Sequence, residues 1–210
     1  MRERFNSEII RRSIITLLIG LLTGSIVTST YHLSANLENS FSFILKCVVY
    51  YLIMITTYRD LFILYSKDHY YTTTVLPIML KKEPTLFNIT YLLLFFNLIG
   101  YMWWSVFLVG TVNFKIGNFE ISYWHVFWGV CFLDGINTGI LRWKANKIFT
   151  CINGKLNEFQ EQLKKWLIYD AIFMTISTIA IFLNHRGRLI CMVAIGLLIF
   201  SYFLKKIDVF

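Results

Sequence analysis

Residues 121–142, ISYWHVFWGVCFLDGINTGILR, form a stretch long enough to cross a bilayer, and Asp134 lies inside it. A helix of about 20 mostly apolar residues spans a hydrocarbon core of about 30 Å. A carboxylate at that depth costs on the order of 3 kcal/mol or more unless it is protonated, paired or hydrated, and it usually faces protein. We therefore expect a membrane helix whose acidic face packs against other helices.

The composition of the whole chain supports the same class. Of its 210 residues 57% are hydrophobic and only 15% are charged, whereas soluble domains have about 25% charged residues. The sequence predicts an all-α fold: a polytopic helical membrane protein whose residues 1–210 form a single transmembrane domain. The expected location is the inner or plasma membrane, with the lipid bilayer as its first partner.

Six transmembrane helices are predicted, within a range of four to six, at residues 13–34, 41–58, 89–112, 121–142, 167–184 and 189–204. The first apolar run is too long for a typical cleaved signal peptide. With six spans, sixteen of the twenty Lys and Arg residues fall on one side of the membrane. Because short cytoplasmic loops are enriched in Lys and Arg, both termini are expected in the cytoplasm.

Small residues recur four apart in two of the predicted spans. Gly20 and Gly24 stand in the first span, and Gly135 and Gly139 stand in the fourth. Such spacing lets two helix backbones approach closely. These glycines are expected to be helix-packing positions, either within the chain or between copies in a homo-oligomer.

Four polar side chains are expected inside the membrane: Asp134, Asn137, Asn97 and Asp170. Asn97 is expected to bond across to a neighbouring helix. Asp60 falls at a depth similar to that of the two acids, and Arg59 and Arg142 fall near it. A paired ionic layer is the first interpretation, because buried ion pairs mostly set packing and specificity. Proton or cation handling by Asp134 is the alternative.

Residues 142–166 form the one substantial polar segment, in which apolar side chains recur every three or four residues. That period predicts an amphipathic cytoplasmic helix between spans four and five. It offers eight residues for partner docking: Ile152, Leu156, Phe159, Leu163, Trp166, Lys155, Lys164 and Lys165. Lying on an anionic bilayer surface is the alternative, but the near-heptad spacing favours helix pairing or docking.

Nothing in the sequence has the pattern of an active site. It contains no Gly-x-Ser-x-Gly or His-Glu-x-x-His motif and no phosphate-binding glycine loop. Its four cysteines are scattered, without the spacing of a zinc site. We therefore expect no enzymatic activity, no cofactor and no metal. The net charge of +8 is explained by membrane orientation, so direct nucleic-acid binding is not expected.

The leading functional hypothesis is a non-enzymatic, oligomeric inner-membrane subunit that senses or anchors and docks a cytosolic protein. The alternative is a small oligomeric channel or transporter with a polar path past Asn97, Asp134 and Asn137. The residue usage, poor in Pro, is typical of AT-rich mobile genes. In overall shape alone the chain resembles the membrane components of two-gene antiphage systems, Kiwa among them. That resemblance implies a role in defence or immunity.

Overall fold

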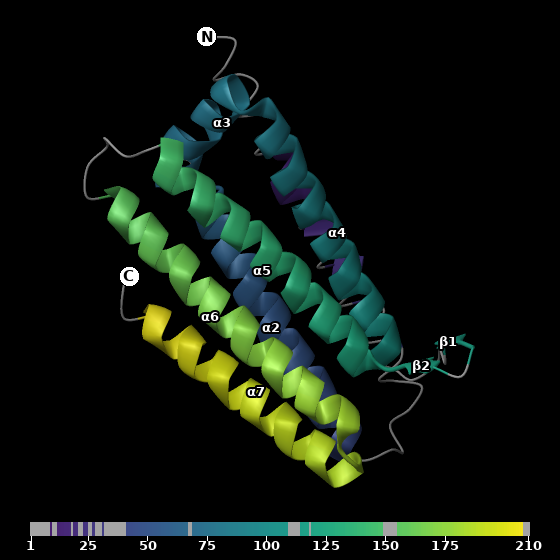
Figure 1. The fold of residues 1–210 in the computed structure, drawn as a ribbon. Helices are drawn as coiled ribbons and strands as arrows, with labels where there is room; N and C mark the ends of the chain where they lie inside the picture. The colour runs from purple at the N-terminus through teal and green to yellow at the C-terminus, as the bar shows by residue number, and fades with distance from the viewer. Residues whose placement is uncertain are drawn as a thin grey trace.

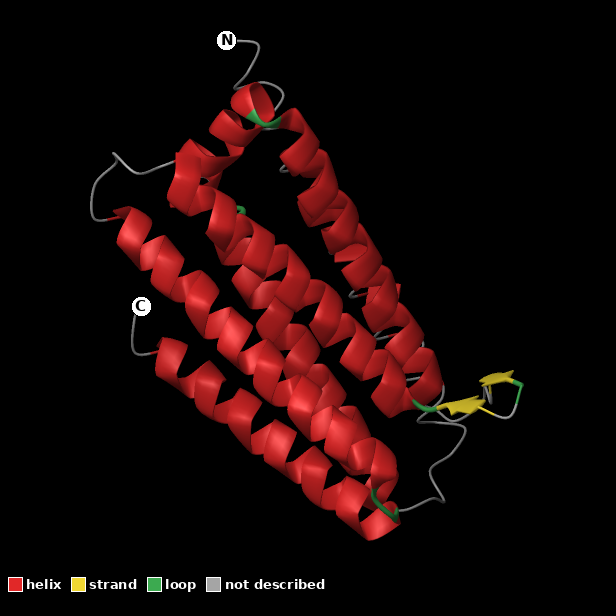
Figure 2. Cartoon of the chain, in the orientation of Figure 1, coloured by secondary structure: helices red, strands yellow, loops and turns green. Residues whose placement is uncertain are grey.

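A computed structural model of the chain describes residues 9, 12–17, 19–20, 23–24, 27, 31, 41–66, 69–108, 114–117, 119–148 and 155–207. Within these residues the fold is almost entirely helical, as Figures 1 and 2 show. The expected all-α class is therefore confirmed. A short helical corner lies at one end of the bundle and a two-stranded hairpin at the other.

Five long helices make up the bundle: α2 (Phe41–Leu64), α4 (Pro84–Leu108), α5 (Tyr123–Ile148), α6 (Lys155–Phe182) and α7 (His185–Ile207). Helix α5 packs between α4 and α6, α7 packs between α6 and α2, and α2 also contacts α4. The helices thus close a ring, with their directions alternating along the chain (Figure 1). Side chains from every member of the ring can reach its centre.

Four of the described helices are long and apolar enough to cross a membrane: Phe43–Leu64, Pro84–Trp104, Asn157–Phe182 and His185–Leu204. This agrees with a multi-pass membrane protein, whereas the six-span count stays a prediction. Helix α5 is less apolar than these four because it carries Asp134 and Asn137. Its position between two apolar helices accommodates those polar groups, since they face protein rather than lipid.

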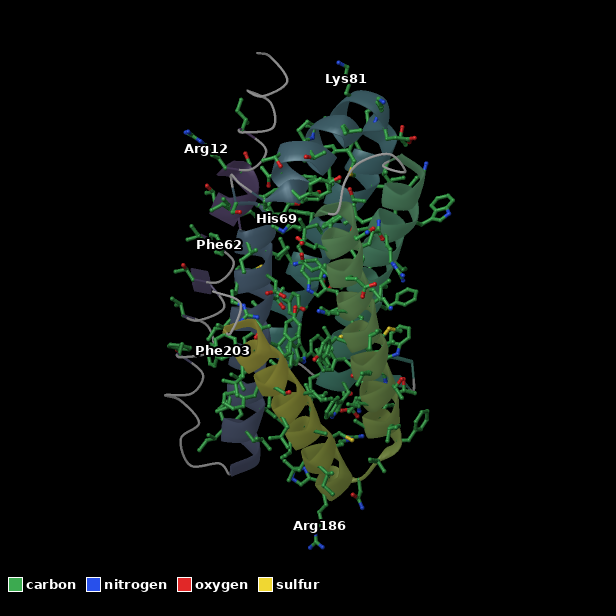
Figure 3. The ribbon with its side chains drawn as sticks, turned by 90° about the vertical axis from the view of Figure 1, so that its left-hand side faces the viewer. Arg12, Phe62, His69, Lys81, Arg186 and Phe203 are labelled. Carbon is green, nitrogen blue, oxygen red and sulfur yellow. The ribbon has the colours of Figure 1, made fainter. Side chains whose placement is uncertain are left out.

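The predicted first span is described only at scattered positions. Those positions are helical, and Ile14 is buried in the core. Arg12 and Lys81 lie toward one end of the molecule and Arg186 lies at the opposite end (Figure 3). The side of the membrane on which each end lies stays a prediction.

The connection between α2 and α4 is shorter than the predicted one between residues 58 and 89. Helix α2 ends at Leu64 rather than at residue 58, so Arg59 and Asp60 lie within a helix. Because these two side chains bond to each other and to α7, the helix continues through them without exposing an unpaired charge. The sequence suggested a break there because it does not reveal these partners.

A π-helix and a short α-helix form the corner itself. The π-helix Tyr71–Val75 leads directly into α3 (Leu76–Lys82), and α4 then begins at Pro84 rather than at residue 89. Proline fits the first turn of a helix because that position needs no backbone donor. A π-helix is rare and often occurs at functional sites.

The predicted outer loop at residues 113–120 contains a short hairpin. Strand β1 (Phe114–Ile116) pairs antiparallel with β2 (Phe119–Ile121). Gly117 in the turn has a φ of 61°, a left-handed conformation that glycine adopts without steric cost. The hairpin brings the chain back to the start of α5.

The amphipathic segment at residues 142–166 is not a separate helix in its described part. Helix α5 continues to Ile148, and α6 begins at Lys155 and runs without a break into the predicted fifth span. The apolar repeat continues from the segment into that span, so one helix accommodates both. In its described part the segment thus consists of two helix ends, and its cytoplasmic location stays a prediction.

The predicted small-residue positions lie in different surroundings. A methyl group built on Gly135 would lie 3.7 Å from Asp170 Cβ, and one on Gly139 would lie 3.9 Å from a second α6 side chain. These two glycines therefore face α6 within the same chain. No described atom lies within 4 Å of such a methyl group on Gly20 or Gly24.

Two other glycines, which the four-residue spacing did not predict, lie where two helices approach most closely. A Cβ on Gly100 would lie 2.8 Å from Val130 Cγ2, where α4 crosses α5. A Cβ on Gly196 would lie 3.0 Å from Val49 Cγ2, where α7 crosses α2. Each glycine stands singly in its helix, so a search for paired small residues does not find it.

Candidate functional site: an acidic cavity inside the helix ring

A cavity of about 90 Å³ lies at the centre of the ring, and all five long helices contribute to its wall. Its acidic lining side chains are Asp60 from α2, Asp134 from α5 and Asp170 from α6. Asn97 and Tyr101 of α4 add further polar groups. No Lys, Arg or His is among the described residues that line the cavity. The site is therefore acidic, and it is large enough to hold several water molecules.

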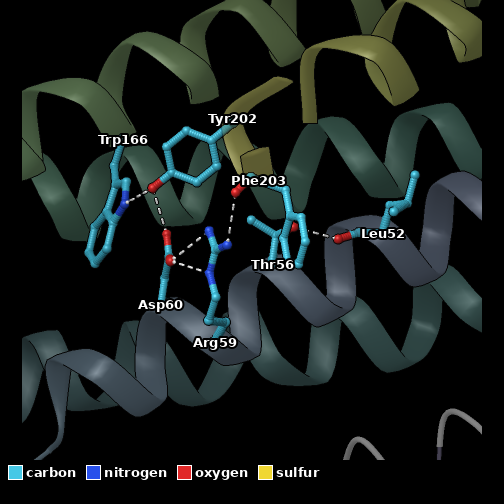
Figure 4. A network of polar contacts seen from close by, with 7 residues as sticks. All are labelled: Leu52, Thr56, Arg59, Asp60, Trp166, Tyr202 and Phe203. Carbon is cyan, nitrogen blue, oxygen red and sulfur yellow. Dashed lines mark hydrogen bonds and ion pairs between the residues drawn. The ribbon is translucent and has the colours of Figure 1, made fainter. Parts of the chain in front are cut away.

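The Asp60 side of the cavity is a satisfied network, shown in Figure 4. The Tyr202 hydroxyl donates to Asp60 Oδ2 at 2.6 Å, and the Trp166 indole donates to Tyr202 Oη at 2.9 Å. The Arg59 guanidinium donates to Asp60 Oδ1 at 3.3 Å and to the carbonyl of Phe203 at 3.3 Å. Both carboxylate oxygens have partners, and the network joins α2, α6 and α7.

Asp134 lines the cavity from α5, and Asn97 of α4 lines the same cavity. The cross-helix hydrogen bond that the sequence predicted for Asn97 stays a prediction. The Asn97 side chain is incompletely satisfied, although only 3% of the residue is exposed. Its acceptor oxygen Oδ1 is buried and has no hydrogen-bond partner among the described residues.

Asp170 of α6 is 8% exposed and also lines the cavity. Its Oδ2 is buried without a hydrogen-bond partner among the described residues. Gly135 lies opposite, where the missing side chain leaves room beside the carboxyl group. A buried polar atom without a partner costs free energy, so this oxygen is the strongest sign of a binding function in the molecule.

Asp134 and Asp170 have no Lys or Arg within ion-pair distance among the described residues. Among the described residues, the expected layer of ion pairs is present only at Asp60, which pairs with the adjacent Arg59. A buried carboxylate without a counter-ion is strongly disfavoured. Neutralisation by a proton or by a bound cation would relieve this cost for Asp170, which is buried, and also for Asp134, which is half-buried at the cavity wall.

A second, smaller cavity of about 40 Å³ adjoins the first, and Asp134 and Trp166 are among the residues that line both. Asn137 and Thr138 contribute its polar lining, and Tyr71 of the π-helix lies on its wall. The Asn137 Oδ1 is also buried without a partner among the described residues. Polar groups thus extend from the centre of the ring toward the helical corner.

The predicted docking stripe has a different environment from the one expected. Phe159 and Leu163 are only 2% and 0% exposed, and the Phe159 ring packs 6.0 Å from that of Tyr71. The stripe is covered by the chain's own corner, so a partner cannot dock on these two side chains in this conformation. The apolar side chains that were predicted to bind a partner are instead buried inside the chain's own fold.

The remaining predicted docking residues are dispersed. Trp166 belongs to the Asp60 network, whereas Lys164 and Lys165 are exposed. Lys164 lies 3.7 Å from Glu161 in a surface ion pair. Ile152 lies outside the described residues, and only the backbones of Lys155 and Leu156 are described.

Sequence reasoning found much of the central site. Asn97, Asp134 and Asp170 meet in one cavity, and Asn137 lies in the adjoining one. It missed the cavity's tyrosines, because an apolar helix with a tyrosine gives no sign of where the hydroxyl group points.

No group of three or more His, Cys, Asp or Glu among the described residues is arranged to hold a metal ion. No protein-family model, curated protein or solved structure matches the chain.

Proposed function

We propose that this protein is a small membrane channel or transporter that binds cations in the acidic cavity of its helix ring. The observation that carries the proposal is the pair Asp134 and Asp170. The two carboxyl groups lie on neighbouring helices and are without a described Lys or Arg in reach. A structural ionic layer would contain its own counter-ions, whereas this arrangement draws positive charge from outside the protein.

The unsatisfied atoms support a cation rather than an anion. Among the described residues that line the two cavities, the buried side-chain atoms without a partner are oxygens of Asn97, Asn137 and Asp170, and all three can accept hydrogen bonds. A proton donor or a cation satisfies acceptors, whereas an anion needs donors. The two adjoining cavities give these oxygens a common path past Asp134.

Flux measurements with the purified full chain in liposomes test the proposal. We expect proton or potassium-ion flux from the wild-type protein, and at least a tenfold loss in Asp134→Asn and in Asp170→Asn. Glu161→Gln removes an exposed carboxylate from α6, and it should keep the wild-type flux. Unchanged flux in both Asp variants, or no cation flux or binding in the wild type, would contradict the proposal.

Docking of a cytosolic protein, homo-oligomerisation and a role in antiphage defence stay predictions from the sequence. Co-purification with neighbouring gene products distinguishes the docking hypothesis from the proposal above. A stable soluble partner bound by a protein without cation flux would favour the scaffold over the channel.

A further inference from the structure

The wall of the cavity indicates which kind of cation it accepts, an inference that rests on the proposed function. Besides its carboxyl groups, the cavity is lined by six aromatic side chains: Tyr101, Phe127, Trp166, Tyr169, Phe173 and Tyr202. They come from α4, α5, α6 and α7. Such a cavity attracts a cation in two ways, through its carboxyl groups and through the π faces of its aromatic rings.

The rings form a continuous row beside Asp170. Phe127 of α5 lies 6.1 Å from Phe173, which lies 6.0 Å from Tyr169 on the same helix. Tyr169 in turn lies 4.7 Å from Tyr202 of α7. Asp170 directly follows Tyr169 and precedes Phe173 by three residues. Asp170 and these four rings all line the same cavity, so a cation bound in it lies between the carboxyl group and aromatic surface.

Other ligand classes fit this wall less well. A hard metal ion needs several oxygen ligands that converge at about 2.0 to 2.6 Å, and no three described acidic, His or Cys side chains are so arranged. An anion would meet no Lys, Arg or His among the described lining residues. A neutral apolar ligand would leave the Asp170 oxygen without a partner, at a cost in free energy.

We infer that the cavity binds a small organic ammonium ion. Its N–H group donates to the carboxyl group of Asp170, and the carboxyl group of Asp134 lines the same cavity. Its alkyl groups lie against the rings of Tyr169 and Phe173, where the positive charge interacts favourably with the π faces. An inorganic ion of the same charge gains less from this wall because it gives up a stronger hydration shell.

The volume limits the size of the ligand. An apolar cavity of about 150 Å³ accommodates benzene with its six heavy atoms. In proportion, the 90 Å³ of this cavity suit a ligand of about four heavy atoms. Trimethylammonium has that size and carries one N–H donor and three methyl groups, so it is the probe of choice.

Calorimetric titration of the purified full chain with trimethylammonium chloride tests the inference, with sodium chloride and neutral tert-butyl alcohol as comparison ligands at constant ionic strength. We expect trimethylammonium to bind at least tenfold more tightly than either. Asp170→Asn should weaken this binding at least tenfold. Tyr169→Leu should weaken it about 2- to 30-fold, whereas Tyr169→Phe, which keeps the ring, should bind as the wild type does.

One further control variant and three possible outcomes complete the test. Phe132→Leu removes an exposed aromatic ring of α5 away from the cavity wall, and it should leave the affinity unchanged. If sodium or potassium ions are bound or carried but trimethylammonium is not preferred, the inference is overturned and the proposed function stands. If Tyr169→Leu binds trimethylammonium as tightly as the wild type, the aromatic wall has no role and the inference is overturned. If no cation is bound or carried, both fail.

Discussion

Asp60 and Asp170 line the same cavity and are almost equally buried, at 6% and 8% exposure, yet their surroundings differ. Both oxygens of Asp60 have partners, from Tyr202 on one side and Arg59 on the other. One oxygen of Asp170 has none among the described residues. Burial therefore does not distinguish the two acids, whereas their hydrogen-bond partners do.

This difference separates a structural carboxylate from a candidate binding carboxyl group. A fully satisfied buried network holds its elements in one arrangement, and the Asp60 network holds α2, α6 and α7 together. A buried polar atom without a partner is rare in folded proteins and calls for a specific reason. Binding of a cation supplies such a reason for Asp170.

The largest effect on stability is expected from Asp60→Asn. The change leaves the Arg59 guanidinium, whose side chain is only 19% exposed, without its counter-ion. We expect a loss of about 3 kcal/mol in the free energy of unfolding, seen as a lower thermal midpoint in detergent. The double variant Arg59→Leu with Asp60→Leu should recover part of the loss. An unchanged midpoint in Asp60→Asn would show that the network is not structural.

Tyr202→Phe should have the next largest effect. It removes the hydroxyl group that joins Trp166 to Asp60. A hydrogen bond to a charged group contributes about 2 kcal/mol, and we expect a destabilisation of that size in the same thermal assay. Tyr169→Phe is the matched control, because the Tyr169 ring packs against Tyr202 but its hydroxyl group is not part of the network. Equal effects of the two changes would contradict the assignment.

A smaller effect is expected from Thr57→Val. The Thr57 hydroxyl group lies 3.3 Å from that of Tyr101 and joins α2 to α4 across the cavity wall. Its removal should cost about 1 kcal/mol. Thr56→Val serves as the control, because Thr56 only donates to the carbonyl of Leu52 in its own helix (Figure 4). If the control lowers the thermal midpoint as much as Thr57→Val does, the cross-helix bond has no separate role.

Asp170→Asn should change stability least, by less than about 1 kcal/mol, because it breaks no ion pair within the described residues and keeps the size of the side chain. Its effect should appear in the cation flux and binding assays instead. The comparison with Asp60 would fail if Asp170→Asn lowered the thermal midpoint as much as Asp60→Asn does. That result would make both acids structural.

Much of the site was accessible from the sequence because an acid or amide within an apolar run is conspicuous. Asp134 and Asn97 were recognised in this way, and both line the same cavity. The role of Arg59 was not accessible. Next to Asp60 it resembled the end of a helix, since the partners on α7 that accommodate the charge lie more than 140 residues away.

The apolar periodicity and the scarcity of charge by themselves determined a helical, multi-pass fold, because those patterns depend only on local geometry and on the cost of charge in an apolar medium. Which buried surfaces meet was decided by the tertiary structure. Phe159 and Leu163 have the same amphipathic period whether they face a partner or the chain's own corner. Asp60 and Asp170 are likewise both acids within apolar helices, and packing against α7 adds the Tyr202 hydroxyl group to the adjacent Arg59 as a partner of Asp60, whereas one oxygen of Asp170 has no partner among the described residues.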